Sequence, residues 1–401
     1  MSEFTDHKEK RVAAFVDFTE RLIAGARGRE LMEEYRFLFK SLVPADIITA
    51  VDRLFQMEIP LEELKVGINK MLNLFQIRIR EYPALQPQEG SFLDLLNRNN
   101  AELKKKLAVL RPKNTQINRD PSDKALIREL LDGFREVEQF VKMYEIKENV
   151  LFPALEKHWD DWRCVQVMWS YHDDIRRELK GLIAVLAEEP FDLKAFNKFL
   201  GDSYYNMHTI IFRDDHILTP VMLERMPAEV LDLLTRESRG LDFPFVKPAE
   251  EVAAEEGEQK AEEVRPVDLG TGVVTPEEIA LMFNHLPLDI TYVDEHDEVR
   301  YFSSPKKRVF HRSISIIGRK VQNCHPPDSV HIVEKIVEAF RKGEKDEASF
   351  WIHMRDDYLL IRYFAVRDAE GKYRGVLEVT QEIGDIQKIE GERRLLDWDD
   401  E

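Results

Sequence analysis

With 401 residues, of which 43% are hydrophobic, the chain is too long for one ordinary core and has enough apolar side chains for two or three globular domains. Its net charge of −18 argues against nucleic acid and anionic membrane surfaces as partners, because phosphate binding requires clustered Lys and Arg. We find no apolar run of the roughly 20 residues that a membrane span needs.

The cellular compartment is indicated by the N-terminus and the cysteines. Residues 1–11 contain no apolar core of a signal peptide. Cys164 and Cys324 are far apart and differ in their surroundings, which fits a reducing compartment better than a structural disulfide. We therefore expect a cytoplasmic protein that does not enter a membrane.

Residues 8–85 are predicted to form a small helical domain. Apolar side chains recur there at helical spacing, as in Val12, Phe15, Val16, Leu22 and Ile23. Pro44 and Pro60 are placed at the starts of the next two helical patterns, where the missing N–H of proline is tolerated.

Residues 88–240 are predicted to form a four-helix bundle. The expected helices cover residues 91–110, 122–144, 162–186 and 193–224, and a continuation of the second as far as 157 is left open. A polar loop that contains Pro112 and Pro121 is expected after the first helix. Short connections between helices of this length favour an up-down bundle.

An acid stands five residues before a proline twice in this region: Glu148 before Pro153, and Asp215 before Pro220. Two helices of the bundle are therefore expected to present inward carboxylates in matching register. This pattern resembles the hemerythrin-like (HHE cation-binding) family, in which such carboxylates bridge two irons. By that resemblance His172 occupies a position where the family often has a ligand, and the spacing of seven places His208 on the same face as Asp215.

The sequence departs from that family at the partner histidines. Tyr144, Met168 and Ile211 stand four residues before Glu148, His172 and Asp215, where a di-iron site would take histidine. We expect a degraded site, in which Glu148, His172, His208 and Asp215 are the remaining metal candidates. Three interpretations stay open: interior polar residues satisfied by hydrogen bonds, a reduced mononuclear site, or a complete di-iron centre.

Residues 245–270 are predicted to be an acidic linker, because seven of the positions 249–264 are Glu and none is aromatic. Residues 271–388 are predicted to form an α+β domain with an antiparallel sheet. The expected strands cover 289–294, 299–303, 348–354, 358–366 and 375–380, and a helix is expected at 329–343. An acidic tail at 389–401 follows, and residues 383–396 are expected to form an exposed helix.

This second half is similar to a PAS domain in the segments 286–294, 299–303, 317–333, 361–367 and 377–381. The likeness is to bacterial and archaeal proteins that join a DUF438 helical domain, a hemerythrin-like bundle and a PAS module. Residues 20–82 resemble the DUF438 portion. The resemblance implies a multidomain chain with an all-α N-terminal half and a C-terminal PAS domain.

Cys324, His325 and His331 are the candidate cofactor-binding residues of the PAS domain. By resemblance, haem-binding PAS domains place their axial ligand on the helix that would carry His331, and a thiolate is another iron ligand. The three residues could also hold a metal, another small ligand or a redox-active thiol. The alternative is structural: a rigid turn at Pro326-Pro327, a helix cap at Asp328 or Ser329, and a small buried Cys324.

The sequence carries no Gly-rich phosphate loop, nucleophile elbow or His-Glu-x-x-His helix, so we expect no enzymatic activity. We expect a sensory or regulatory protein in signal transduction, whose PAS domain binds a small ligand or cofactor and shifts the population of the helical half. Output would then pass to a protein partner or through a homodimer. The alternatives are an iron protein that handles oxygen, nitric oxide or iron, and a metal-free scaffold that dimerises through its PAS domain.

Overall fold

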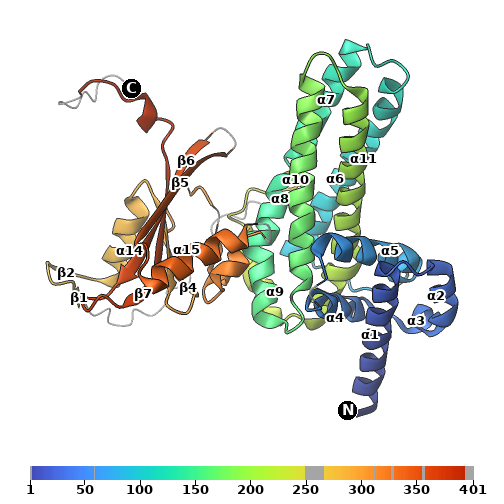
Figure 1. Ribbon diagram of the computed structural model, residues 1–401, viewed down its shortest axis with the longest axis horizontal. Helices are drawn as coiled ribbons and strands as arrows, with labels where there is room; N and C mark the ends of the chain where they lie inside the picture. The colour runs from blue at the N-terminus through green and yellow to red at the C-terminus, as the bar shows by residue number, and fades with distance from the viewer. Residues whose placement is uncertain are drawn as a thin grey trace. The chain divides into compact units, whose positions relative to one another are not determined.

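The computed structural model describes residues 2–57, 59–248, 266–306, 308–310, 312–326, 329–354 and 357–392. They belong to two compact units, a helical N-terminal one and a C-terminal one with a sheet, which are described separately (Figure 1). Most of the expected acidic linker lies outside the described residues, which omit 249–265.

The first unit begins with a layer of five helices. They are α1 (Ser2–Ile23), α2 (Gly28–Glu34), α3 (Arg36–Ser41), α4 (Pro44–Phe55) and α5 (Leu61–Arg80). The start of α4 at Pro44 follows from the orphan N–H groups of the first helical turn, which proline does not need. Phe15 and Phe18 of α1 both contact Phe75 of α5, with ring centroids 5.4 and 5.3 Å apart. These aromatic contacts fix α1 on α5.

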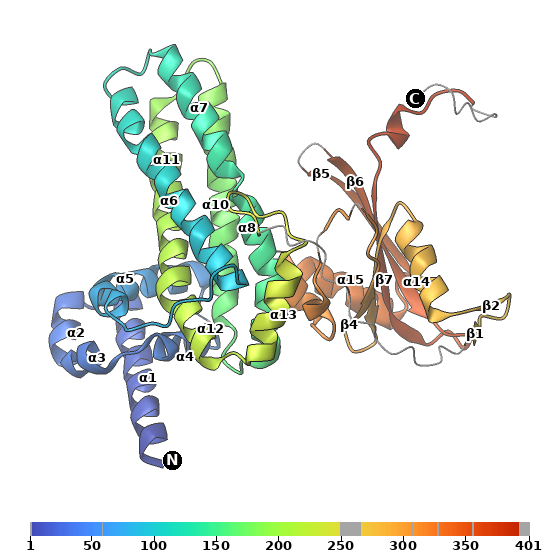
Figure 2. The same cartoon turned by 180° about the vertical axis from the view of Figure 1, so that it is seen from behind.

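Four long helices lie side by side in the rest of this unit (Figures 1 and 2). They are α6 (Phe92–Ile117), α7 (Lys124–Glu138), α10 (Cys164–Ala187) and α11 (Leu193–Arg213). Shorter elements extend α7 and α11: α8 (Val141–Ile146), the π-helical turn η1 (Lys147–Leu151), α9 (Phe152–His158), the π-helical turn η2 (Asp214–Leu218), α12 (Thr219–Arg225) and α13 (Ala228–Ser238). The buried side chains of this bundle and of the N-terminal layer form one continuous hydrophobic core.

Two boundaries of the bundle helices differ from the sequence prediction. The loop expected at Pro112 is wrong, because α6 continues through this proline to Ile117. Leu110, Asn114 and Ile117 extend the buried stripe of the helix, and their packing outweighs the local penalty of the proline. The second predicted helix is interrupted after Glu138, where a turn separates α7 from α8.

The second unit is built on a five-stranded antiparallel sheet in the order β4-β3-β7-β6-β5. Its strands match the predicted ones to within two residues at each end: β3 (Asp289–Asp294), β4 (Val299–Phe302), β5 (Glu347–Met354), β6 (Asp357–Arg367) and β7 (Tyr373–Glu382). Central pairs such as Tyr292 with Leu377 and Tyr363 with Glu378 set the register. A separate hairpin and two helices accompany the sheet: β1 (Val267–Asp268), β2 (Val273–Val274), α14 (Pro276–His285) and α15 (Val330–Lys342).

The two helices cover opposite faces of this sheet. On the inner face, α15 buries Val337 and Phe340 in a cluster with Val293 of β3. On the outer face, Phe283 of α14 contacts Tyr301 of β4 at 5.8 Å between ring centroids. Side chains alternate between faces along a strand, so Tyr292 points to the face opposite that of Val293. Tyr301 pairs with Tyr292 and shares its face, which places α14 opposite α15 (Figure 2). The sequence analysis did not predict α14.

The tail shows one further difference. The helix expected over residues 383–396 is absent from its described part, where only a single 3-10 turn forms at Ile386–Lys388 and residues 389–392 are not helical. Residues 393–401 lie outside the described part. The predicted fold class, an all-α N-terminal half followed by an α+β domain with an antiparallel sheet, is confirmed.

Candidate functional site

The two acid–proline motifs form matching π-helical turns in the bundle. η1 precedes Pro153 and η2 precedes Pro220, and the second residue of each turn is the predicted acid, Glu148 or Asp215. Proline cannot donate to the helical ladder and its ring crowds the preceding turn, so one extra residue enters the turn before it. The motif thus has a local backbone consequence that the chain repeats on two helices.

Glu148 is the centre of the first polar cluster. Its carboxylate accepts hydrogen bonds from His172 Nδ1 at 2.8 Å and from Arg176 Nη2, which lies 2.8 and 2.7 Å from its two oxygens. Burial raises the pKa of Glu148 to about 7, while the charge of Arg176 acts in the opposite direction. The cationic Arg176 therefore balances a carboxylate that is only 6% exposed.

His172 is held in one orientation inside the bundle. Its ring is stacked between Tyr144 and Phe152, at centroid distances of 4.4 and 5.7 Å. Burial lowers the pKa of His172 well below its usual range, so the imidazole is neutral and donates its Nδ1–H to Glu148. Its buried Nε2 has no hydrogen-bond partner within the described residues. Nε2 therefore keeps a lone pair that could coordinate a metal, but one ligand alone does not hold a metal ion.

A second cluster lies where the other π turn begins. Lys147 Nζ is 2.8 Å from both carboxylate oxygens of Asp214, and the two side chains are 0% and 1% exposed. Asn100 Nδ2 donates to Asp215 at 2.9 Å, and Lys104 Nζ lies 2.6 Å from the other oxygen of Asp215. Both acids of η2 therefore have cationic partners.

The four predicted metal candidates do not converge. Glu148 and His172 are in contact, whereas Asp215 belongs to the second cluster and His208 is exposed on the bundle surface beside Tyr204. Among the residues that the structure describes, no group of three or more His, Cys, Asp or Glu side chains could hold a metal ion. The spacing of seven predicted His208 on the same face as Asp215, but the His208 side chain is exposed to solvent, and the hydrogen bonds to Asp215 come from other side chains.

The donor set does not fit the di-iron centre that the family resemblance implies. A metal would need inward carboxylates with free lone pairs and several neutral imidazoles. Three acids of the bundle interior instead face a cationic side chain: Glu148 with Arg176, Asp214 with Lys147, and Asp215 with Lys104. A second positive charge in the form of a metal would be repelled from these positions.

Sequence reasoning missed the cations of this site. Lys147 lies next to Glu148, and Arg176 lies one helical turn after His172, so both could have been read as partners of the predicted acids. The only signal was their position inside an otherwise apolar helical pattern. Asn100 and Asp214 had no such signal, because their contacts join helices that are distant in the sequence.

In the C-terminal unit, the three candidate cofactor residues do not line one interior space. His331, the candidate axial ligand, is exposed on α15. Cys324 is partly buried and packs at the margin of a core that includes Val321 and Phe340, so it is less enclosed than the structural alternative proposed. The inner face near α15 is thus occupied by apolar side chains, and the residues do not fit a haem with His331 as axial ligand.

His325 and Ser329 lie in the segment that leads into α15. The half-buried His325 has its Nδ1 2.9 Å from the carbonyl oxygen of Val321, and burial lowers the pKa of His325. The neutral ring donates through Nδ1, so Nε2 carries the lone pair. Ser329 precedes α15 without a side-chain cap, while Pro327 and Asp328 lie outside the described residues.

The inner face of the sheet carries buried charges that sequence analysis did not single out. Asp289 accepts hydrogen bonds from the backbone N–H groups of Val309 and Phe310, at 2.9 and 3.1 Å, and lies 3.7 Å from Arg308 Nε. Burial raises the pKa of Asp289 and lowers that of Arg308. This ion pair fixes the segment after β4 on the start of β3.

A second pair lies further along the same face. Arg312 Nη2 is 3.3 Å from Glu378 Oε2, and their side chains are 11% and 13% exposed. Burial, together with the charge of Glu378, raises the pKa of the neighbouring Tyr363. The inner face is therefore apolar beneath α15 and charged beyond it.

A groove of about 740 Å³ opens at the charged end of this face. Its lining includes cationic, acidic and neutral polar groups, namely His285, Asp289, Lys306, Arg308, Asp357, Thr380 and Glu382. Leu281, Leu286 and Met354 add apolar surface. Such a mixture of convergent polar groups and apolar walls is typical of small-molecule sites.

Comparison with known protein families identifies both halves of the chain. Residues 91–242 match the hemerythrin HHE cation-binding domain, and residues 279–384 match a PAS domain. The DUF438 resemblance of residues 20–82 stays a prediction. No curated protein matches the chain.

Solved structures similar to parts of the chain come from several bacteria. The C-terminal domain of a protein from Streptococcus mutans is 33% identical; the match covers 32% of this chain and 100% of that one, with a TM-score of 0.31. A PAS domain from Colwellia psychrerythraea is 15% identical, with coverages of 27% and 97% and a TM-score of 0.23. The PAS domain of Bordetella pertussis BvgS is 12% identical, with coverages of 28% and 88% and a TM-score of 0.24.

In the part of the chain that the structure describes, no helix combines the length and the apolar character needed to cross a bilayer.

We predict that Asp214→Asn lowers the free energy of unfolding by about 3–5 kcal/mol, because it leaves the charge of Lys147 buried without a counter-charge. The double variant Lys147→Met, Asp214→Leu should recover most of this loss, since apolar pairs often replace buried ion pairs at little cost. Chemical denaturation followed by circular dichroism measures both. Glu189→Gln is the control, because its partner Lys124 and Glu189 itself are 80% and 77% exposed.

We also predict that protein purified from iron-supplemented cells contains only substoichiometric iron, because Arg176, Lys147 and Lys104 already neutralise the inward acids. Elemental analysis by mass spectrometry makes the measurement. Stoichiometric iron that is lost in the Glu148→Ala variant would overturn the assignment of this site to ion pairs.

Proposed function

Because the chain belongs to the proteins that join a hemerythrin HHE domain to a PAS domain, we propose that it is a sensory or regulatory protein of the cytoplasm. Its PAS domain binds a small polar ligand, and its helical half passes the change on without a catalytic step. The cytoplasmic location is supported by the two cysteines, neither of which forms a disulfide.

The observation that carries this proposal is the groove beside Asp289 and Arg308. Its lining offers both positive charge, from Lys306 and Arg308, and negative charge, from Asp289, Asp357 and Glu382. A molecule that carries an ammonium and a carboxylate group complements such a surface, because each of its charges finds an opposite one. A free amino acid is the simplest ligand of this class.

The bundle suits a regulatory role better than iron chemistry. Glu148, Asp214 and Asp215 are balanced by cations of the chain itself, and burial raises the pKa of Glu148 to about 7. A helical body with such fixed internal contacts can transmit or receive a rearrangement as a unit. The alternative is an iron protein that handles oxygen or nitric oxide. Among the described residues, no group of His, Cys, Asp or Glu side chains supplies the ligands that it would need.

A second copy of the chain is the partner that the sheet edge favours. β5 is an edge strand, and Phe350, Trp351 and Ile352 on it are 36%, 62% and 40% exposed. An exposed apolar edge strand offers unpaired backbone groups for strand addition. Antiparallel pairing of β5 with its own copy satisfies a two-fold axis without any other protein, so we include homodimerisation in the proposal.

For the ligand site, we predict that Lys306→Met and Asp357→Asn each weaken amino-acid binding by about tenfold or more, the loss of roughly one charge-assisted contact. Isothermal titration of the full chain with the common free amino acids identifies the ligand and measures its affinity. Lys335→Met, an exposed change on α15 outside the groove, should leave the affinity unchanged. Failure of every amino acid to bind, or equal affinity in Lys306→Met, would refute the site.

For the partner, we predict that Trp351→Glu shifts the dimer towards monomer, because it places a charge in the middle of the apolar edge. Sedimentation velocity over a range of protein concentrations measures this shift. Val273→Glu changes a side chain of the same unit that is 64% exposed and lies away from β5, and it should leave the association unchanged. A wild-type chain that is monomeric at all concentrations would contradict the prediction.

A further inference from the structure

Arg213 is a buried cation that has no counter-charge among the residues that the structure describes. The residue is 6% exposed, and a guanidinium cannot be deprotonated in proteins, so its charge is present inside the helical unit. The carboxylate of Asp214, the next residue in the sequence, forms its ion pair with Lys147 instead. Within the described part of the chain, Arg213 forms no ion pair with any carboxylate, in contrast to Lys147 and Arg176.

The contacts of Arg213 are all neutral. Its Nη2 donates to Asn69 Oδ1 at 2.8 Å, and its guanidinium lies 4.4 Å from the ring centroid of Tyr171. Asn69 Nδ2 in turn contacts the Tyr171 hydroxyl at 2.5 Å. These groups fix the direction of the guanidinium, but its buried Nη1 has no hydrogen-bond partner in the described part of the chain.

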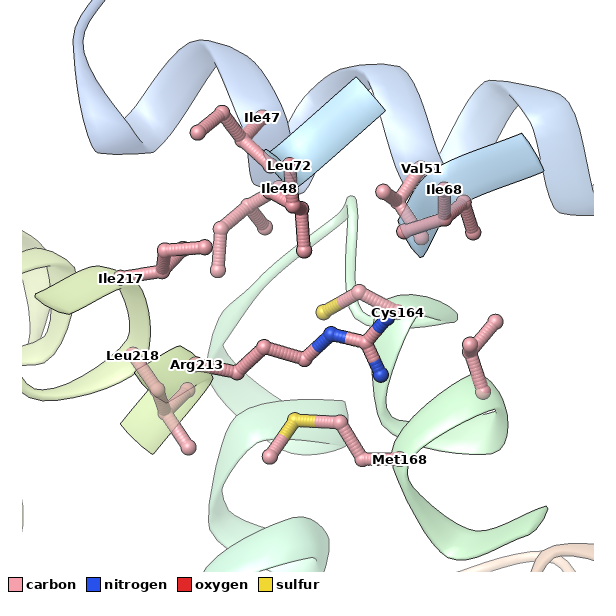
Figure 3. Close-up of a pocket in the computed structure, with 11 residues that line it drawn as sticks. Ile47, Ile48, Val51, Ile68, Leu72, Cys164, Met168, Arg213, Ile217 and Leu218 are labelled. Carbon is pink, nitrogen blue, oxygen red and sulfur yellow. The ribbon is translucent and has the colours of Figure 1, made fainter. Parts of the chain in front are cut away.

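The guanidinium lies in a small cavity, and Figure 3 shows the Arg213 side chain extending across it. The cavity lies where the N-terminal helices meet the bundle. α4 and α5 contribute aliphatic side chains, and α10 and η2 close the other sides, with the lining Ile47, Ile48, Val51, Ile68, Leu72, Cys164, Val167, Met168, Ile217 and Leu218. Apart from Arg213, every lining residue is aliphatic or carries sulfur.

Cys164 does not supply the missing negative charge. Burial and the nearby acids Asp161 and Asp52 raise the pKa of its thiol, which therefore stays protonated. A neutral thiol is a weak acceptor and does not balance a guanidinium. An uncompensated buried charge is costly, and an anion inside the cavity is the remaining way to offset it.

The size and the walls of the cavity define this anion. The volume is about 40 Å³, and one water occupies roughly 10–15 Å³ on the same scale, so about three or four non-hydrogen atoms fit. Carboxylate oxygens match the N–H donors of a guanidinium, and a hydrogen or methyl substituent suits the aliphatic walls. We propose that this cavity binds a short monocarboxylate of the size of formate or acetate through Arg213.

Such a site lies apart from the PAS groove and adds a second input to the proposed regulatory function. The bound anion would contact α4 and α5 on one side and α10 and η2 on the other, so its binding energy would strengthen the contact between the N-terminal helices and the bundle. The helical half would then respond to the level of a small carboxylate independently of any PAS ligand.

The test compares sodium acetate and sodium formate with sodium chloride at equal ionic strength, using the full chain. At a concentration about 100 times its dissociation constant, a bound anion lowers the unfolding equilibrium constant about 100-fold. We expect a carboxylate-dependent rise in Tm for the wild type and for Arg128→Met, an exposed arginine on α7, and none for Arg213→Met. Hydrogen exchange should slow in α4 and α5 but not in the PAS sheet.

Arg213→Met replaces the guanidinium with an unbranched apolar side chain that suits the aliphatic walls, and it removes a buried unpaired charge, so we expect it to fold. Val167→Leu provides a second variant, which retains Arg213 and adds a methylene group to the cavity; it should weaken acetate binding. Equal stabilisation by chloride, an unchanged acetate effect in Arg213→Met, or unchanged binding in Val167→Leu would each overturn the proposal.

Discussion

The neutralisation of buried carboxylates by cations of the same chain is the constraint on which the helical half depends. Lys147 and Asp214 have almost no exposed surface, and neither charge could remain there without the other. Arg176 has the same relation to Glu148 on the neighbouring helices. The bundle keeps the π turns and inward acids of a metal-binding architecture, but its own side chains supply the positive charge that a metal would bring.

Arg213 differs from Lys147 and Arg176 because no carboxylate among the described residues pairs with it. Three buried or half-buried acids have cations, whereas the polar and aromatic contacts of this cation among the described residues are the amide oxygen of Asn69 and the ring of Tyr171. Its cavity lies in the contact region of α4 and α5 with the bundle, where a single core joins the two layers. Lys147 and Arg176 both have carboxylate partners, so the position beside Arg213 is available for an anion from outside.

The inner face of the PAS sheet has an apolar part and a charged part. Beneath α15 the packing of Val337 and Phe340 closes the space, whereas beyond it the pairs of Asp289 with Arg308 and Glu378 with Arg312 keep charge close to a groove. Recognition at this end depends on electrostatic complementarity more than on enclosure. The Cys-His segment then contributes to the framework around α15.

The sequence by itself determined the strands, the bundle helices and the matching register of Glu148 and Asp215, because periodicity and the effect of proline are local properties of the chain. It could not determine the course of α6 through Pro112, the exposure of His208 and His331, or the partners of the inward acids. Those depend on which distant side chains meet in the core, such as Lys147 with Asp214 across 67 positions. Only the tertiary structure places Arg213 in an apolar cavity without a carboxylate, because a missing partner is a property of the whole fold.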